Sequence, residues 1–223
     1  MADSDETIYR EAVRELVDWC NEHFLELNVT KTEEMIVDFR RKKELVQPLT
    51  IKVEEVRQVS TYKYLGTTID DQLCWTTNVD ACLKKANLRL FFLRKLRQFK
   101  VGSNILYLFY RSVIQSSLGY NQLCYYGAIK EDDARRLNRV VEKAQQIVGH
   151  DIESLGTIYE NVSIKKAQSI TKDDSHPLHS TLTDCQSKRV QGRYKSFKCH
   201  TSRFANTFVP SVIRSQNEKH ERH

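Results

Sequence analysis

The stretch Thr61-Tyr-Lys-Tyr-Leu-Gly-Thr-Thr-Ile-Asp70, followed by Asp71-Gln-Leu-Cys-Trp75, separates two differently patterned parts of the chain. Its β-forming residues nearly alternate, at Tyr62, Tyr64, Thr67 and Ile69. Gly66 suits a bulge or a point of close backbone approach, and the pair Asp70-Asp71 is typical of the end of a strand. The stretch therefore predicts one strand with a turn after it.

The residues before this strand predict a mixed first third. Apolar residues recur at helical spacing from Ile8 to Phe24, which predicts an amphipathic helix with an acidic outer face. The segments 25–29 and 33–39 are short and apolar with a turn between them, and we expect them to pair as a hairpin. Further strands are predicted between Leu49 and Val59.

After Trp75 the apolar spacing becomes helical. Helices are predicted at 78–99, 103–118 and 131–148, with Gly149 ending the third helix, and two short helices at 152–159 and 162–170. From Ser180 the chain is polar, basic and weakly periodic, which predicts a loosely ordered tail. The fold class is therefore α+β, divided into 1–75, a helical bundle at 76–150, and short helices with a basic tail at 151–223.

Composition predicts an intracellular protein. Of 223 residues 40% are hydrophobic and three are proline, so a packed, largely helical body is expected. The acidic N-terminus does not resemble a signal peptide, and no run of eighteen apolar residues would cross a membrane. The six scattered cysteines suit buried, reduced thiols in the nucleus or cytoplasm.

Charge is distributed unevenly along the chain. Residues 1 to 30 hold eight acids, namely Asp3, Asp5, Glu6, Glu11, Glu15, Asp18, Glu22 and Glu26. The segment 84–100 holds no acid and seven bases, namely Lys84, Lys85, Arg89, Arg94, Lys95, Arg97 and Lys100. Nine further bases lie in 185–223. Such clusters favour a polyanionic partner, although a solvated basic face has the same composition.

Several chemistries lack their motifs. The seven glycines never lie two apart, and no phosphate-binding loop is present, so no nucleotide cofactor and no small-molecule substrate is predicted. Five residues between 176 and 200 are of types that can bind zinc: His176, His179, Cys185, Cys199 and His200. Their spacing matches no common zinc finger, and we predict no metal site.

Long strings of the chain resemble reverse transcriptases of LINE-type non-LTR retrotransposons. The segment 27–33 resembles the loop of their fourth palm motif, Tyr62-Lys63-Tyr64-Leu65-Gly66 resembles the primer grip, and 85–96 with 109–112 resembles the thumb. The resemblance implies a palm remnant at 1–75 and a thumb at 76–150. It also implies that Lys31 stands at a general-acid position and that Tyr62 to Gly66 contact nucleic acid.

The resemblance places the metal-binding aspartates of the polymerase ahead of residue 1, so the expectation is a catalytically incomplete remnant rather than an enzyme. We expect it to bind RNA, single-stranded DNA or an RNA–DNA hybrid without sequence preference. The alternative is a non-catalytic fragment whose helices merely pack, without a nucleic-acid partner.

The segment Lys84 to Gly127 carries a second resemblance. It is similar to a short module found at the N-terminus of AlkB-type RNA-modifying oxygenases that carry a methyltransferase. No histidine of the chain is followed two residues later by Asp or Glu, so the iron-binding triad of an oxygenase has no obvious first ligands. We therefore expect this module to occur here without oxygenase or methyltransferase chemistry.

Overall fold

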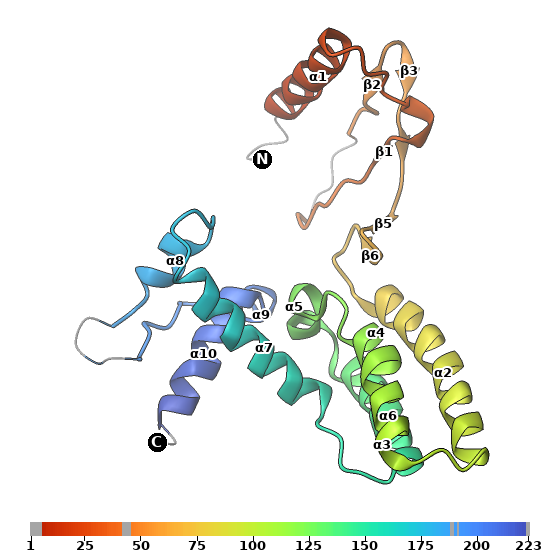
Figure 1. The fold of residues 1–223 in the computed structure, drawn as a ribbon. Coiled ribbons are helices and arrows are strands. Elements are labelled where there is room, and N and C mark those ends of the chain that lie inside the picture. Colours follow the sequence, from red (N-terminus) through yellow and green to blue (C-terminus); the bar gives the residue numbers. More distant parts are fainter. Residues whose placement is uncertain (1–5, 42–45, 188–189, 191, 222–223) are drawn as a thin grey trace. The chain divides into compact units, whose positions relative to one another are not determined.

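The computed structural model describes residues 6–41, 46–187, 190 and 192–221 (Figure 1). The chain is α+β, as predicted, and divides into two compact units, Met1–Cys74 and Trp75–His223. Eight charged residues of the sequence lie outside the described residues, namely Asp3, Asp5, Lys42, Lys43, Glu44, Lys188, Arg189 and Arg222.

The first unit is built on helix α1 (Thr7–Glu22) and a hairpin of strands β2 (Thr50–Ile51) and β3 (Glu54–Glu55). Leu49, Ile51 and Val56 are buried, and one face of α1 packs on them. This face contains Tyr9, Val13 and Val17, whose spacing of four residues places them on one side of a helix. The predicted amphipathic helix and the predicted strands after Leu49 are thus present.

The predicted hairpin between 25–29 and 33–39 is wrong. Residues Val29–Lys31 form a 3₁₀ helix, η1, because the Asn28 side chain accepts a hydrogen bond from the Lys31 amide at 3.2 Å. The strand that follows, β1 (Glu33–Glu34), is two residues long and pairs in parallel with β4 (Arg57–Gln58). Because β4 is more than twenty residues away in sequence, no local turn signal could have revealed this pairing.

The stretch Thr61–Asp70 forms a hairpin rather than one strand, which corrects the sequence prediction. Strand β5 (Thr61–Tyr64) pairs antiparallel with β6 (Thr67–Asp70), so that Tyr64 faces Thr67. The two-residue turn has Leu65 at φ 46° and Gly66 at φ 84°. These positive angles define the type of turn that matches strand twist in a tight hairpin, and Gly66 therefore supplies turn geometry, not a bulge.

The second unit contains the predicted helical bundle. Its elements are α2 (Thr76–Gln98), α3 (Ser103–Phe109), a π-helix η2 (Tyr110–Gln115), α4 (Ser116–Leu118), α5 (Gln122–Tyr125), a 3₁₀ helix η3 (Tyr126–Ala128) and α6 (Glu131–Val148). Helices α2 and α6 lie side by side (Figure 1). Gly149 ends α6 in the left-handed conformation at φ 79°, as its position predicts.

The core of this bundle follows the apolar stripe predicted for 78–99, whereas Ile105 and Leu108, expected on the buried face of the helix at 103–118, are exposed. Val79, Ala86, Leu90 and Leu93 of α2 are almost completely buried. They pack with buried residues of the other helices, namely Leu106, Tyr110, Ile114, Leu118, Tyr125, Leu137, Val140, Val141, Ala144, Val148 and Leu155. Burying so many apolar side chains in one cluster is the main stabilising contribution to the bundle.

The two short helices predicted at 152–159 and 162–170 form one helix, α7 (Leu155–Ile170). The Ser154 side chain caps its start by accepting from the Thr157 amide at 3.2 Å. Tyr159, Ser163 and Ala167 are buried at spacings of four, so one buried stripe continues across the gap at 160–161 between the two predicted helices.

The C-terminal part is more ordered than the predicted tail. It contains α8 (His179–Thr183), α9 (Ser202–Ala205) and α10 (Phe208–Glu221). A second core joins α10 to α7 and α8 through Ala167, Ile170, Leu182 and Val212. The apolar residues near 208–213 were too few to give a clear helical period, and their burial depends on contact with α7.

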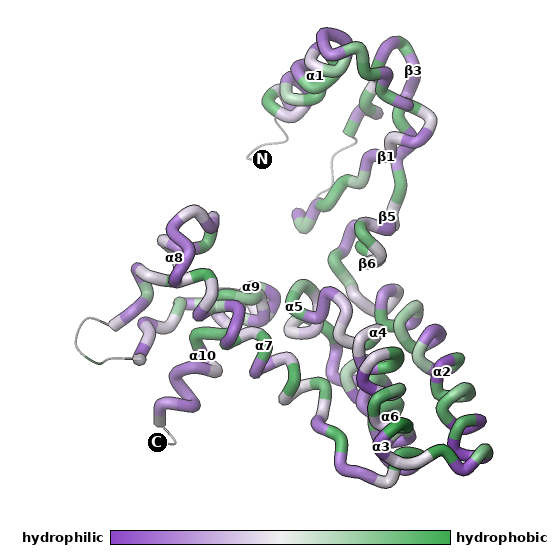
Figure 2. The backbone as a smooth tube through the Cα atoms, viewed as in Figure 1, coloured by the Kyte–Doolittle hydropathy of each residue, from purple (hydrophilic) through white to green (hydrophobic). Residues whose placement is uncertain are grey.

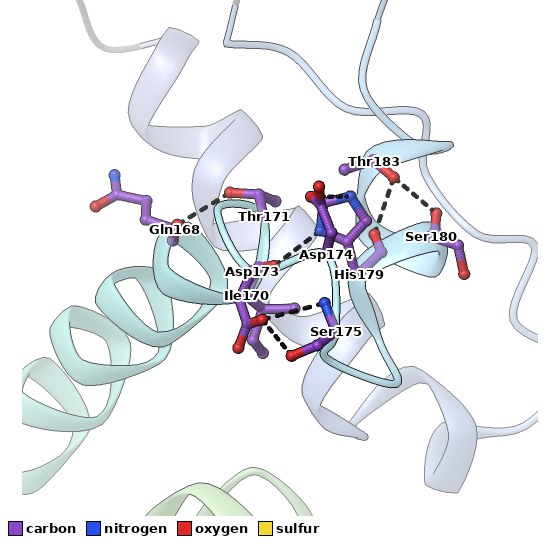
Figure 3. Close-up of polar contacts among 9 residues, drawn as sticks. All are labelled: Gln168, Ile170, Thr171, Asp173, Asp174, Ser175, His179, Ser180 and Thr183. Carbon is purple, nitrogen blue, oxygen red and sulfur yellow. Dashed lines mark hydrogen bonds and ion pairs between the residues drawn. The ribbon is translucent and has the colours of Figure 1, made fainter.

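The turn predicted at Asp173–Pro177 connects α7 to α8 (Figure 3). Asp173 Oδ1 accepts from Ser175 Oγ at 2.6 Å and from the Ser175 amide at 3.1 Å, and these hydrogen bonds lower the pKa of the Asp173 carboxyl. His179 Nδ1 donates to the Ile170 carbonyl at 3.1 Å, and its Nε2 lies 3.4 Å from Asp174. The side chains of this turn therefore stabilise the connection between α7 and α8.

None of the helices in the part of the chain described is long and apolar enough to cross a membrane.

Candidate nucleic-acid interface

Helix α2 has two distinct long faces. The core residues Val79, Ala86, Leu90 and Leu93 occupy one face. The opposite face forms an outer stripe of Lys84, Leu88, Phe91, Phe92, Lys95 and Phe99 at the spacings of three and four that one side of a helix requires. Its apolar members are strongly exposed, at 61% for Leu88, 48% for Phe91, 50% for Phe92 and 78% for Phe99. Figure 2 shows hydrophobic and hydrophilic residues alternating along this helix.

The outer stripe lies in a region without negative charge. No Asp or Glu occurs between Asp80 and Glu131, whereas this segment contains nine Lys and Arg residues. The Lys95 ammonium lies 5.6 Å from the centre of the Phe91 ring, within cation–π distance. Exposed apolar rings bordered only by cations form a surface that favours an anionic partner with apolar parts.

Six of the seven predicted basic contacts are exposed. Lys84, Lys85, Arg94, Lys95, Arg97 and Lys100 all face solvent. Arg89 is half-buried, and its Nη1 donates to the Val113 carbonyl at 2.6 Å, so this guanidinium holds α2 to the π-helix η2.

The other predicted contacts lie on the hairpin of the first unit. Tyr62 and Tyr64 are two residues apart on β5, so they share one face of the hairpin, and both are exposed. Lys63 is also exposed. Leu65 is 69% exposed and has a positive φ, a conformation that is uncommon for a bulky residue and is found at functional sites. The tip thus presents Leu65 and Gly66 to solvent.

The predicted general-acid residue Lys31 lies in η1 and is exposed. Among the residues that the structure describes, no group of three or more His, Cys, Asp or Glu side chains could hold a metal ion. Three of the candidate zinc ligands make other contacts. His176 Nδ1 accepts from the Leu178 amide at 3.1 Å, His179 Nδ1 donates to the Ile170 carbonyl, and Cys199 Sγ donates to the Phe197 carbonyl.

A hollow of about 490 Å³ lies between the π-helix and α7. Its lining includes Arg111, Gln115, Gln122, Leu155 and Ile158, and no carboxylate or imidazole contributes to it. This hollow therefore lacks an acid–base pair and a metal-ligand set.

Sequence reasoning identified the basic residues of α2 but not its exposed apolar residues. The signal was available, because Leu88, Phe91, Phe92 and Phe99 repeat at helical spacing in addition to the core residues. A helix with two apolar stripes can bury either one, and only the packing of α2 against α6 decides between them.

One family model matches the chain, over residues 75–116. It describes the N-terminal part of alkylated DNA repair protein alkB homolog 8. The match covers 42 of 223 residues, about a fifth of the chain, and includes α2 with its outer stripe, α3 and η2. It overlaps the predicted AlkB-like module and so confirms that part of the sequence analysis. No curated protein and no solved structure matches the chain.

Proposed function

We propose that the chain is a catalytically incomplete remnant of a LINE-type reverse transcriptase, and that it binds nucleic acid without sequence preference through α2. The observation that carries this proposal is the exposed basic face of α2 within a segment of fifty residues that lacks acids. Each phosphate that such a face neutralises releases condensed counterions, whatever the base sequence. The strings at 27–33, 62–66 and 85–96 support the assignment to reverse transcriptases.

The same reasoning supports the absence of polymerase chemistry. Phosphoryl transfer by a polymerase needs two metal ions held by carboxylates. The sequence contains no Tyr-x-Asp-Asp, and the described part of the chain has no group of three or more His, Cys, Asp or Glu side chains that could hold a metal ion near Lys31 or elsewhere. A general acid without a metal-bound phosphate has nothing to protonate.

Fluorescence anisotropy with labelled RNA, single-stranded DNA and an RNA–DNA hybrid tests the binding proposal. We expect affinity to fall steeply as salt rises from about 50 to 200 mM. The triple variant Arg94→Glu, Lys95→Glu, Arg97→Glu should bind more weakly and with a shallower salt dependence. The matched control is Arg135→Glu, Arg139→Glu, Lys143→Glu, which changes the same charge on α6, where all three side chains are exposed. Absence of binding at low salt, or equal losses in both triples, would contradict the proposal.

A primer-extension assay with Mg²⁺ or Mn²⁺ tests the second half of the proposal. We expect no nucleotide to be added to any primer on an RNA or DNA template. Extension by a single nucleotide in a preparation free of other polymerases would overturn it.

A second candidate function is a protein-interaction fragment that binds no nucleic acid. The exposed Leu88 and Phe99, together with Ile105 and Leu108 of α3 at 61% and 64% exposure, favour it because apolar patches of this kind also occur at protein interfaces. The match to the alkB homolog 8 N-terminal model lies over the same helices. The salt titration separates the two candidates, since this alternative predicts no binding of any nucleic acid.

A further inference from the structure

The outer stripe of α2 combines lysines and phenylalanines, which contact different parts of a nucleic acid. Lysines interact with phosphates, which both single strands and duplexes present. Phe91 and Phe92 are half-exposed rings, and an aromatic ring interacts with a base only where the face of that base is free. In a surface that bound duplexes through phosphates alone, exposed phenylalanine rings would contribute nothing to the binding energy.

The two rings also differ in orientation. Their centroids are 5.6 Å apart and their planes are inclined by 72°. Bases in contact with both rings must turn relative to one another. A single strand allows this turn through its rotatable backbone, whereas neighbouring bases in a duplex stay parallel within the stack. The ring geometry is therefore compatible with unpaired bases and not with paired ones.

The charges are placed to hold the backbone of such a strand. Lys95 lies beside the Phe91 ring, and Lys84 lies at the other end of the stripe. From Lys84 to Phe99 the helix advances fifteen residues, or about 22 Å at 1.5 Å per residue. That length accommodates several nucleotides of an extended strand.

We propose that the Phe91–Phe92 pair stacks against unpaired bases and makes the α2 surface selective for single-stranded nucleic acid over duplex. The inference rests on the proposed function. It adds a preference for single strands over duplexes, which the basic residues alone would not produce. Stacking on one aromatic ring changes affinity by about tenfold per base, so removal of both rings should have a large effect.

The test uses the full chain with two fluorescent probes, a twenty-nucleotide oligo-dT and a twenty-base-pair duplex. We expect the single strand to bind at least tenfold more tightly than the duplex. The double variant Phe91→Leu, Phe92→Leu keeps the apolar character but loses both rings, and it should lose at least tenfold in affinity for oligo-dT. Its affinity for the duplex and its salt dependence should stay unchanged.

Two further variants complete the experiment. Phe91→Tyr, Phe92→Tyr keeps both rings and should restore selectivity, while Ile105→Ala, Leu108→Ala removes exposed apolar side chains elsewhere and should leave it intact. Equal binding of both probes by the unaltered protein, or full oligo-dT affinity in the leucine variant, would overturn the inference while nucleic-acid binding still stood. Failure to bind either probe would instead refute the proposed function, and the inference with it.

Discussion

The Thr76 hydroxyl, in the first turn of α2, donates to Oδ2 of Asp133, in the first turn of α6, at 2.8 Å. The Asp133 side chain is buried, and its other oxygen, Oδ1, accepts from Nη1 of Arg136 at 2.8 Å. Arg136 also forms an ion pair with Asp80 of α2. The two longest helices of the bundle are thus joined at their N-terminal ends, where a carboxylate is also stabilised by the helix dipole.

Replacement of Thr76 by Val should lower the free energy of unfolding by about 1–2 kcal/mol, because one oxygen of a buried carboxylate loses its donor. Urea denaturation measures the change. Thr77→Val is the control, since Thr77 is exposed on the same turn and should shift stability by less than about 0.5 kcal/mol. In the double variant Thr76→Val, Asp133→Asn, the two effects should not be additive. Additive effects would show that the hydrogen bond contributes nothing.

The turn between β2 and β3 predicts a stabilising substitution. Lys52 and Val53 both have positive φ, at 48° and 73°, and Val53 is 96% exposed. A β-branched residue is strained in this conformation, whereas glycine adopts it freely and is preferred in such two-residue turns. Val53→Gly should therefore raise the melting temperature of the first unit, with a gain of about 1 kcal/mol.

The control for this change is Val37→Gly, at an exposed valine outside the turns with positive φ, which should be neutral or destabilising. Thermal unfolding followed by circular dichroism provides the comparison. A loss of stability in Val53→Gly would mean that this exposed side chain makes a contact that the turn geometry does not suggest.

Gly127 and Gly156 should respond to alanine in opposite directions. A Cβ at Gly127 would lie 2.6 Å from the Tyr159 hydroxyl and 2.8 Å from the Asn206 carbonyl, so backbone must move to admit it. Such overpacking costs about 1–3 kcal/mol. Gly156 lies in the first turn of α7, where a Cβ would meet only ordinary contacts at 3.7 Å. Gly156→Ala should be neutral or stabilising by up to about 1 kcal/mol, because alanine favours the helix. Equal chemical denaturation curves for the two variants would contradict this packing.

The sequence predicted the helical bundle well because its signals are local and consistent. Along α6, the buried residues Leu137, Val140, Val141 and Ala144 repeat at helical spacing, and Gly149 ends the helix where a positive φ is needed. The sequence of Thr61–Asp70 predicts one strand instead of the observed hairpin because Leu65 occupies a turn position that normally carries Asn, Asp or Gly. The pairing of β1 with β4 depends on contacts between distant segments, which a local pattern does not contain.

For the candidate interface, the sequence identifies the basic residues but does not show which of them are exposed and which form hydrogen bonds within the protein. The exposure of Lys84, Arg94 and Lys95 follows from their type, since such side chains are seldom buried. The hydrogen bond from Arg89 to the Val113 carbonyl depends on how α2 packs against η2, and a local sequence pattern does not contain that packing. The exposure of the apolar residues in the outer stripe could not be predicted, because it depends on which side of α2 packs against α6.

Tyr110 begins the π-helix and is completely buried, yet its hydroxyl has no hydrogen-bond partner within the described part of the chain. A buried hydroxyl without a partner costs about 1–3 kcal/mol relative to its hydrated state. Tyr110→Phe should thus stabilise the bundle by about 1 kcal/mol at neutral pH. Tyr125 is the matched comparison, because its hydroxyl donates to the Leu118 carbonyl at 2.9 Å, and Tyr125→Phe should destabilise by a similar amount.

The same hydroxyl predicts a dependence on alkaline pH. Burial raises the pKa of Tyr110 from 10.0 to about 12, since the folded protein disfavours the phenolate. The unfolded chain therefore releases this proton first, and the free energy of unfolding is unaffected below about pH 10 and falls as pH rises from 10 towards 12. The loss amounts to about 1.4 kcal/mol per pH unit for this one group. In Tyr110→Phe this contribution is absent, so the stability difference between variant and unaltered protein, measured by urea denaturation, should widen from pH 10 to 12. A constant difference across that range would show that Tyr110 ionises as readily in the folded protein as in the unfolded chain.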